Sequence, residues 1–151
     1  MHLLSDRKRG GFTILELVIV MSIMALMAAV AIPRVADTIR HNKVNRAAMI
    51  VAGDLQTAFS VAGRQRAPVR ISVNTGTKTY TIAVRSTGTS IRTRALGSTS
   101  EYTLSALTFS PATIDIFPTG ISSDVLTVTV TSGDYSRQVT ASRAGLVRLP
   151  Q

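Results

Sequence analysis

The chain has 151 residues, of which 45% are hydrophobic and 5% aromatic, and its 17 basic and 8 acidic side chains leave a formal charge of +9. This length accommodates one ordinary domain with one added segment. Because cysteine is absent, disulfide frameworks, thiolate metal sites and cysteine nucleophiles are excluded. Tryptophan is also absent, and the few aromatic residues cannot build a base-stacking platform for single-stranded nucleic acid.

An apolar segment extends from Phe12 to Ile32, and its only polar residues are Thr13, Glu16 and Ser22. As a helix, these residues would measure about 31 Å, which matches the roughly 30 Å of a bilayer's hydrocarbon core. Three basic residues at positions 7–9 precede the segment. Basic residues beside a span stay in the cytoplasm, so we predict a transmembrane helix over residues 12–33 with the following domain outside.

Two simpler interpretations of this segment leave one residue unexplained. A secretory signal peptide would use the small-x-small pattern at residues 29–31 as its cleavage site, but its apolar region is usually only about 7–15 residues long. A plain membrane anchor would explain the length. Neither gives a role to Glu16, although an acid costs up to about 2.5–3.5 kcal/mol in mid-membrane and less near an end.

The stretch GFTILE, residues 11–16, resembles the cleavage-and-assembly motif of type IV prepilins and type II secretion pseudopilins. The resemblance implies that residues 1–11 form a leader peptide, that prepilin peptidase cuts between Gly11 and Phe12, and that Phe12 is then N-methylated. It also implies that Glu16 sets the register of an incoming subunit against its neighbour's amino terminus. Pro33 stands where this family commonly has a proline.

The residue types suit this chemistry. Glycine before the cut lets an extended backbone enter a peptidase site without side-chain obstruction. The cut creates a positive amine on Phe12 at the start of a buried helix. A carboxylate such as that of Glu16 can offset this charge, since a paired buried charge is far less costly than an unpaired one.

Proline either kinks or ends a helix. Because a second helical pattern follows Pro33, we predict that this residue kinks one long, bent amino-terminal helix. The apolar positions of this pattern recur at spacings of three and four, and they are Val44, Ala48, Val51, Leu55, Ala58 and Ala62. The opposite face carries Arg46, Asp54 and Gln56, and Gly63 is a plausible stop. We predict an amphipathic helix over residues 34–63 whose apolar face packs on a soluble domain.

Residues 64–151 are predicted to form a β-rich globular domain. The alternating segments 69–73 and 80–84 flank turn residues and predict a hairpin, whereas residues 86–100 are rich in Ser, Thr, Gly and Arg and predict a loop. Further strands are predicted at 102–109, 113–117, 125–131, 137–142 and 146–149. The expected fold is therefore α+β, with a long amino-terminal helix packed on an antiparallel sheet.

The carboxyl-terminal half carries a second resemblance. IDIFPTG at residues 114–120 and SRAGLVRL at residues 142–149 are similar to the carboxyl-terminal domain of H-type minor pseudopilins and related minor pilins, the GspH/FimT group. Phe117, Gly120, Gly145 and Arg148 stand at the positions that recur in that group. Any antiparallel sheet also needs glycines at its turns, which is the simpler interpretation of these residues.

An enzyme is the least supported function class. Beyond His41 the chain has no histidine, and it shows no phosphate loop, paired-carboxylate motif or metal-ligand spacing, so no cofactor is expected. The resemblance implies a minor pseudopilin, a structural subunit of the type II secretion pseudopilus. It would be a single-pass protein of the inner membrane, with its amino terminus cytoplasmic and its carboxyl-terminal domain periplasmic. The implied partners are prepilin peptidase, other pseudopilins or pilins, and the inner-membrane assembly machinery.

The alternative is a minor type IV pilin that acts in pilus assembly or in DNA binding and uptake. From residue 64 onward ten basic residues face four acidic ones, and such a surplus binds DNA through counterion release. Arg143 and Arg148 flank the terminal hairpin and are the candidate DNA contacts. Because the arginines form no tight run and have no aromatic residues between them, we favour the interpretation that they solvate a small domain.

Overall fold

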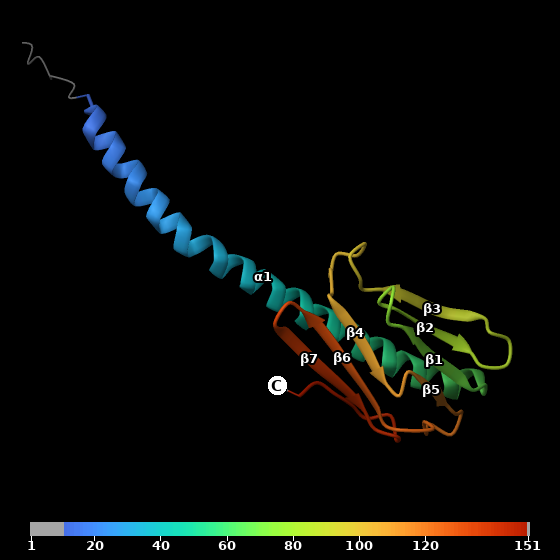
Figure 1. The fold of residues 1–151 in the computed structure, drawn as a ribbon. Coiled ribbons are helices and arrows are strands. Elements are labelled where there is room, and N and C mark those ends of the chain that lie inside the picture. The colour runs from blue at the N-terminus through green and yellow to red at the C-terminus, as the bar shows by residue number, and fades with distance from the viewer. Residues whose placement is uncertain (1–10, 151) are drawn as a thin grey trace, which may run out of the picture. The chain divides into compact units, whose positions relative to one another are not determined.

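The computed structural model of the protein describes residues 11–150. The chain divides into two units, Met1–Asp37 and Thr38–Gln151. One α-helix, α1, runs from Ile14 to Gln65 and contributes to both units (Figure 1). The helix continues through Pro33, so this proline does not end it, and it stops two residues beyond Gly63.

In the first unit, α1 is apolar and exposed. Its side chains from Phe12 to Ile32 lie at the surface of the chain. Within the described residues, α1 is the one helix that is long and apolar enough to cross a membrane, judged by length and composition. A helix that is apolar on all sides requires a protein or lipid environment around it.

In the second unit, α1 packs against the strands through the predicted apolar face. The six predicted positions are each at most 1% exposed, and they are Val44, Ala48, Val51, Leu55, Ala58 and Ala62. Ala47, Ala52 and Val61 widen this buried stripe. The prediction of an amphipathic helical face over this region is thus confirmed.

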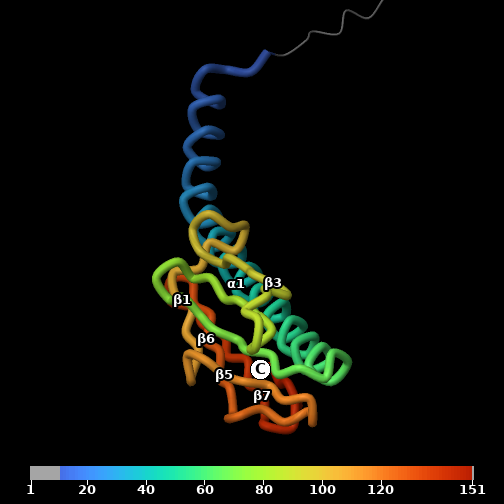
Figure 2. Tube along the Cα trace, turned by 90° about the vertical axis from the view of Figure 1, so that its right-hand side faces the viewer, coloured from blue at the N-terminus to red at the C-terminus, as the bar shows by residue number. Residues whose placement is uncertain are grey.

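Eight strands form two four-stranded antiparallel sheets in the second unit (Figures 1 and 2). The first sheet has the order β3-β2-β1-β5 and the second β4-β6-β7-β8. The strands are β1 Val69–Asn74, β2 Thr79–Val84, β3 Ser90–Ala95, β4 Ala106–Ser110, β5 Thr113–Ile116, β6 Leu126–Ser132, β7 Tyr135–Ala141 and β8 Val147–Arg148. The predicted α+β class is confirmed, and the strands are shared between two sheets rather than gathered in one.

A single hydrophobic core joins α1 to both sheets. The strands reach it by alternation: in β6, Leu126, Val128 and Val130 are buried, while the threonines between them are only half-buried. The first hairpin is confirmed as well, since β1 and β2 pair from Val69 opposite Val84 to Asn74 opposite Thr79.

Two strand predictions were wrong. Residues 86–100, predicted to form a loop, contain β3, because this edge strand turns arginines rather than apolar residues toward the helix. The strand predicted at 102–109 begins only at Ala106. Tyr102 and Leu104 are buried in the preceding loop, so their apolar character reflects burial and not strand pairing.

Gly145 is the glycine that the fold constrains most. Its φ is +79°, and an added Cβ would lie 3.0 Å from Cδ1 of Phe59. We expect Gly145→Ala to lower the free energy of unfolding by about 1–3 kcal/mol through strain and overpacking. Thermal unfolding of the full chain in detergent would measure this loss. Gly63→Ala is the control, since Gly63 is helical and has open space around it; equal melting temperatures for both variants would contradict the prediction.

Candidate functional site

The predicted cleavage point lies just before the helix. Gly11 and Phe12 belong to no helix or strand, and Phe12 is 82% exposed. No atom of the described residues lies within 4 Å of the position that a Cβ on Gly11 would occupy. The bond between the two residues is therefore accessible outside the helix. The basic residues at 7–9 and the rest of the leader, residues 1–10, lie outside the described residues.

Thr13 begins the helix and orients its first turn. The backbone N–H of Glu16 donates to Thr13 Oγ1 at 3.2 Å, and the N–H of Leu17 donates to the Thr13 carbonyl at 3.1 Å. This is the spacing of a capping box, in which the third helical residue is an acid or amide. Glu16 thus lies in the first turn, where a negative charge also favours the helix dipole, and its side chain is exposed.

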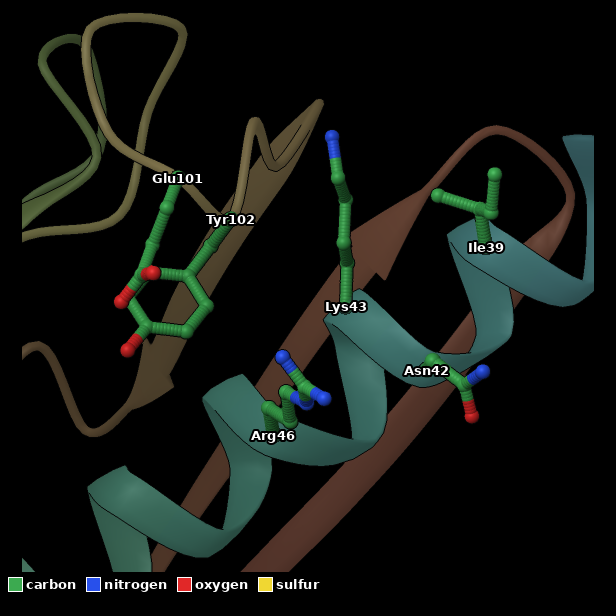
Figure 3. A pocket seen from close by; sticks show the side chains of 6 residues that line it. All are labelled: Ile39, Asn42, Lys43, Arg46, Glu101 and Tyr102. Atoms are coloured by element: carbon green, nitrogen blue, oxygen red, sulfur yellow. The ribbon is translucent and has the colours of Figure 1, made fainter.

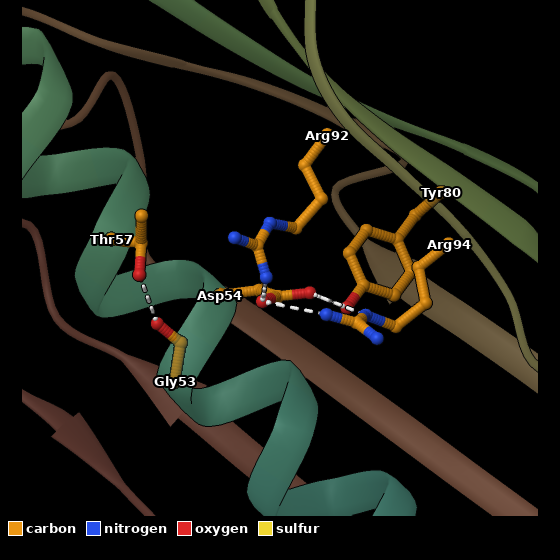
Figure 4. Close-up of polar contacts among 6 residues, drawn as sticks. All are labelled: Gly53, Asp54, Thr57, Tyr80, Arg92 and Arg94. Atoms are coloured by element: carbon orange, nitrogen blue, oxygen red, sulfur yellow. Dashed lines mark hydrogen bonds and ion pairs between the residues drawn. The ribbon is translucent and has the colours of Figure 1, made fainter.

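A buried carboxylate lies on α1 in the second unit (Figure 4). Asp54 is 4% exposed, although the sequence placed it on the solvated face of the helix, and that prediction was wrong. Its oxygens accept hydrogen bonds from Tyr80 Oη at 2.5 Å and from Arg92 Nη1 at 2.9 Å. Arg94 donates through Nε at 2.7 Å and Nη2 at 3.2 Å. We call these four residues the Asp54 cluster.

The Asp54 cluster ties the edge strand β3 to the helix. Burying a carboxylate is costly unless it is paired and hydrogen-bonded. Here two arginines, whose side chains are 44% and 29% exposed, supply the opposite charge, and a tyrosine supplies a neutral donor. Because four hydrogen bonds occupy the carboxylate, it is positioned to hold the two elements together and not to act as an acid or base.

Tyr80 makes the stability of the Asp54 cluster depend on pH in the alkaline range. Burial and the hydrogen bond to Asp54 raise the pKa of Tyr80 well above its ordinary value of about 10. Its contribution to stability is therefore complete below about pH 10 and is lost as the pH rises from there toward the folded-state pKa. We expect the free energy of unfolding to fall steeply above pH 10, and less steeply in Tyr80→Phe. Tyrosinate absorbance during alkaline titration would check this, and a Tyr80 that ionises normally in the folded chain would contradict it.

A pocket of about 250 Å³ opens between α1 and the loop before β4 (Figure 3). It is lined by Ile39, Asn42, Lys43, Arg46, Glu101 and Tyr102. Lys43 Nζ donates to Thr103 Oγ1 at 2.9 Å, and the neighbouring Glu101 carboxylate raises the pKa of Tyr102. The pocket brings together two cations and one carboxylate, an arrangement suited to holding a polar or anionic group. Among residues 11–150, no three potential metal ligands lie close enough to hold an ion.

The carboxyl-terminal residues singled out in the sequence lie in turns and at an edge. Gly120, with a φ of +79°, closes a tight turn in which its N–H donates to the Phe117 carbonyl at 3.0 Å. Arg143 lies in the loop between β7 and β8, and Arg148 lies in β8 opposite Thr140. Both arginine side chains are exposed.

The amino-terminal motif and the fold are both similar to those of known proteins. Residues 6–32 match the family described as the prokaryotic N-terminal methylation motif. The fold is similar to that of the type IV minor pilin FimU of Pseudomonas aeruginosa strain PAO1, with 23% identity and a TM-score of 0.59, covering 73% of this chain and 90% of FimU. No protein with a curated description matches the chain in sequence.

A second solved structure is the minor pseudopilin EpsH from the type 2 secretion system of Vibrio cholerae. It is 16% identical, with a TM-score of 0.55, and the match covers 72% of this chain and 96% of EpsH. Identities this low establish the fold. The chain therefore has the fold shared by a minor pilin and a minor pseudopilin, and it carries the prokaryotic N-terminal methylation motif over residues 6–32.

Proposed function

We propose that the chain is a minor pseudopilin, a structural subunit of the type II secretion pseudopilus that supports protein export across the outer membrane. The observation that carries this proposal is the methylation motif at the start of a membrane-length helix that leads into a pilin-like domain. By analogy with prepilins, residues 1–11 would form the leader and residues 12–33 the helix for membrane insertion and assembly. Residues 34–63 would form the amphipathic helix, and residues 64–151 the periplasmic domain.

The roles of the motif residues follow from their positions. Prepilin peptidase would cut the exposed bond between Gly11 and Phe12, and the new amine on Phe12 would be methylated. The mature chain would then start one residue before Thr13, which caps the helix. Glu16 would face the amine of Phe12 in its own chain or in a neighbouring subunit, where an opposite charge lowers the cost of burial.

The same fold supports a second candidate function, that of a minor type IV pilin. The likeness to FimU is comparable to the likeness to EpsH, so the fold does not favour one fibre over the other. Loss of protein export in a strain that lacks the chain, with normal pilus function, would support the pseudopilus. Loss of pilus function or of DNA uptake, with normal export, would support the alternative.

Processing is the direct test of the amino-terminal part. We expect Gly11→Val to lower the rate of leader removal at least tenfold, equivalent to about 1.4 kcal/mol of barrier, because a β-branched side chain obstructs the extended backbone. The intact mass of the full chain purified from cells that contain prepilin peptidase would report the cut and the methyl group.

Gly53→Val is the matched control, since Gly53 is an exposed glycine far along the sequence. It should be cut and methylated normally. A mature chain that begins after Ala31 would instead show a secretory signal peptide, and would overturn the proposal.

A further inference from the structure

The outer face of the second sheet is polar except at one end. On β6, Thr127, Thr129 and Thr131 point away from the core, as the burial of the residues between them shows. Their partners on β7 are likewise uncharged and polar: Thr140, Gln138 and Ser136. Val125 precedes β6 by one residue and continues the same alternation, yet it is apolar and 47% exposed.

A second exposed apolar residue lies beside Val125. Leu146, in the loop before β8, is 54% exposed, and it lines a groove of about 360 Å³ together with Val125, Thr140, Ser142 and Arg148. We call this region, with the adjacent Ile121, the loop-end patch. After the end of α1, Ile121, Val125 and Leu146 are the exposed large hydrophobic residues of the described chain.

Hydrogen bonds hold Leu146 in this exposed position. Its N–H donates to Ser142 Oγ at 3.1 Å, and its carbonyl accepts from the Ser142 N–H at 2.9 Å. The Gly145 N–H donates to the Ser142 carbonyl at 3.0 Å. A neighbouring loop is joined to this one, since the Ser122 N–H donates to the Arg143 carbonyl at 2.8 Å. The fold therefore presents the apolar side chains on a fixed frame, as an interface requires.

The charges beside the patch lack partners within the described residues. Neither Arg143 nor Arg148 forms a side-chain hydrogen bond or ion pair with any of residues 11–150. Two carboxylates of the domain are already paired with other arginines. Asp54 forms ion pairs with Arg92 and Arg94, and Asp115 forms ion pairs with Arg70 (2.7 Å, N to O) and Arg85 (3.4 Å, N to O).

The charge composition of the second unit also favours an acidic partner for the patch. It carries thirteen basic and five acidic residues. A second copy of this chain would bring more positive charge to the patch, whereas a partner with a carboxylate would complement it.

We propose that the loop-end patch docks a different prepilin-type chain of the same fibre, one that places an apolar side chain between Val125 and Leu146 and a carboxylate against Arg148. This inference rests on the proposed function, which supplies the class of partner. A nucleic acid would satisfy the arginines but would leave the exposed aliphatic side chains without an apolar complement.

Crosslinking in cells tests the proposal with the full chain. Because the chain has no cysteine, Ala144→Cys adds a single thiol at an exposed loop position next to the patch, to which a benzophenone maleimide can be attached. We expect a photo-adduct with another prepilin-type chain of the host, identified by mass spectrometry. Ser86→Cys, exposed in the β2–β3 turn, is the control label and should not give this adduct.

Substitutions in the patch should then remove the adduct. We expect Leu146→Ser and Arg148→Glu each to lower its yield at least tenfold without changing the melting temperature, because both side chains are exposed. Arg66→Glu, an exposed arginine outside the patch, should leave the yield unchanged. Reversing the partner's carboxylate to lysine should restore the adduct with Arg148→Glu.

Several outcomes would overturn the inference. One is an adduct only with a second copy of this chain. Another is the absence of an adduct with any prepilin-type chain, although the protein is cut at Phe12 and present in the fibre. A third is binding of duplex DNA by the full chain in detergent that Arg148→Glu abolishes while the adduct persists. A chain that is never cut or never enters the fibre would refute the proposed function itself, and the inference with it.

Discussion

Replacing Asp54 by alanine is expected to lower the free energy of unfolding of the second unit by about 2–4 kcal/mol. The substitution removes four hydrogen bonds at once and leaves the hydroxyl of Tyr80 buried without its acceptor. Breaking a fully buried ion pair costs more, but the arginines are partly exposed and water can solvate them after the change. Denaturant unfolding of the full chain in detergent, followed by circular dichroism, would measure the loss.

Asp115 offers a matched control on the outer face of the first sheet. It too is paired with two arginines, and the hydrogen bond from Arg70 holds the pKa of its carboxyl below the ordinary range. Both of those arginines are 45% exposed, so water screens the pair. Asp115→Ala should therefore cost much less than Asp54→Ala. Equal losses at the two sites would show that burial does not set the strength of the Asp54 cluster.

The helix face and most strands could be predicted because their period is local. Val44, Val51 and Leu55 recur at helical spacing, and Leu126, Val128 and Val130 alternate in β6, so each buried set is visible within a short window of sequence. The division into two sheets could not be predicted in this way. It depends on which strands pair across long separations, as when β1 takes β5 as its second neighbour.

Asp54 and β3 were missed for one shared reason. When they are considered separately, an acid on a helix and two arginines on a threonine-rich strand are each predicted to be exposed to solvent. Only the pairing of Arg92 and Arg94 with Asp54 lets these polar residues take core-facing positions. The spacing of the two arginines by two residues was the available signal, since it places both on one face of a strand.

The cleavage motif and the loop-end patch also differ in how far they could be predicted from local sequence. Gly11, Phe12, Thr13 and Glu16 are contiguous, so a sequence motif can carry their chemistry, and the matched methylation motif covers them. The loop-end patch joins residues from three segments and appears only when the faces of β6 and β8 are known. From the sequence, Arg148 could therefore be named only as a candidate DNA contact, an interpretation that was not favoured, and without the apolar residues beside it.

Glu16→Gln is expected to leave the cut and methylation at Phe12 intact and to lower incorporation of the chain into the fibre at least tenfold. Glutamine keeps the size of the side chain, and the backbone N–H of residue 16 still donates to Thr13 Oγ1, so the first turn of α1 is preserved. Only the negative charge is lost, and the amine of Phe12 would then be buried without compensation in an apolar environment. Glu16→Val should give the same defect, since it too removes the negative charge.

The measurement is the ratio of this chain in sheared fibres to that in the membrane fraction, at equal expression. Glu101→Gln is the control, because it removes a carboxylate from the second unit and leaves the helix start unchanged. Glu16→Asp keeps the charge on a shorter side chain and should incorporate better than Glu16→Gln if charge is what matters. Normal incorporation of Glu16→Gln would contradict the registering role of the carboxylate and would leave Glu16 only its favourable position in the first turn of α1.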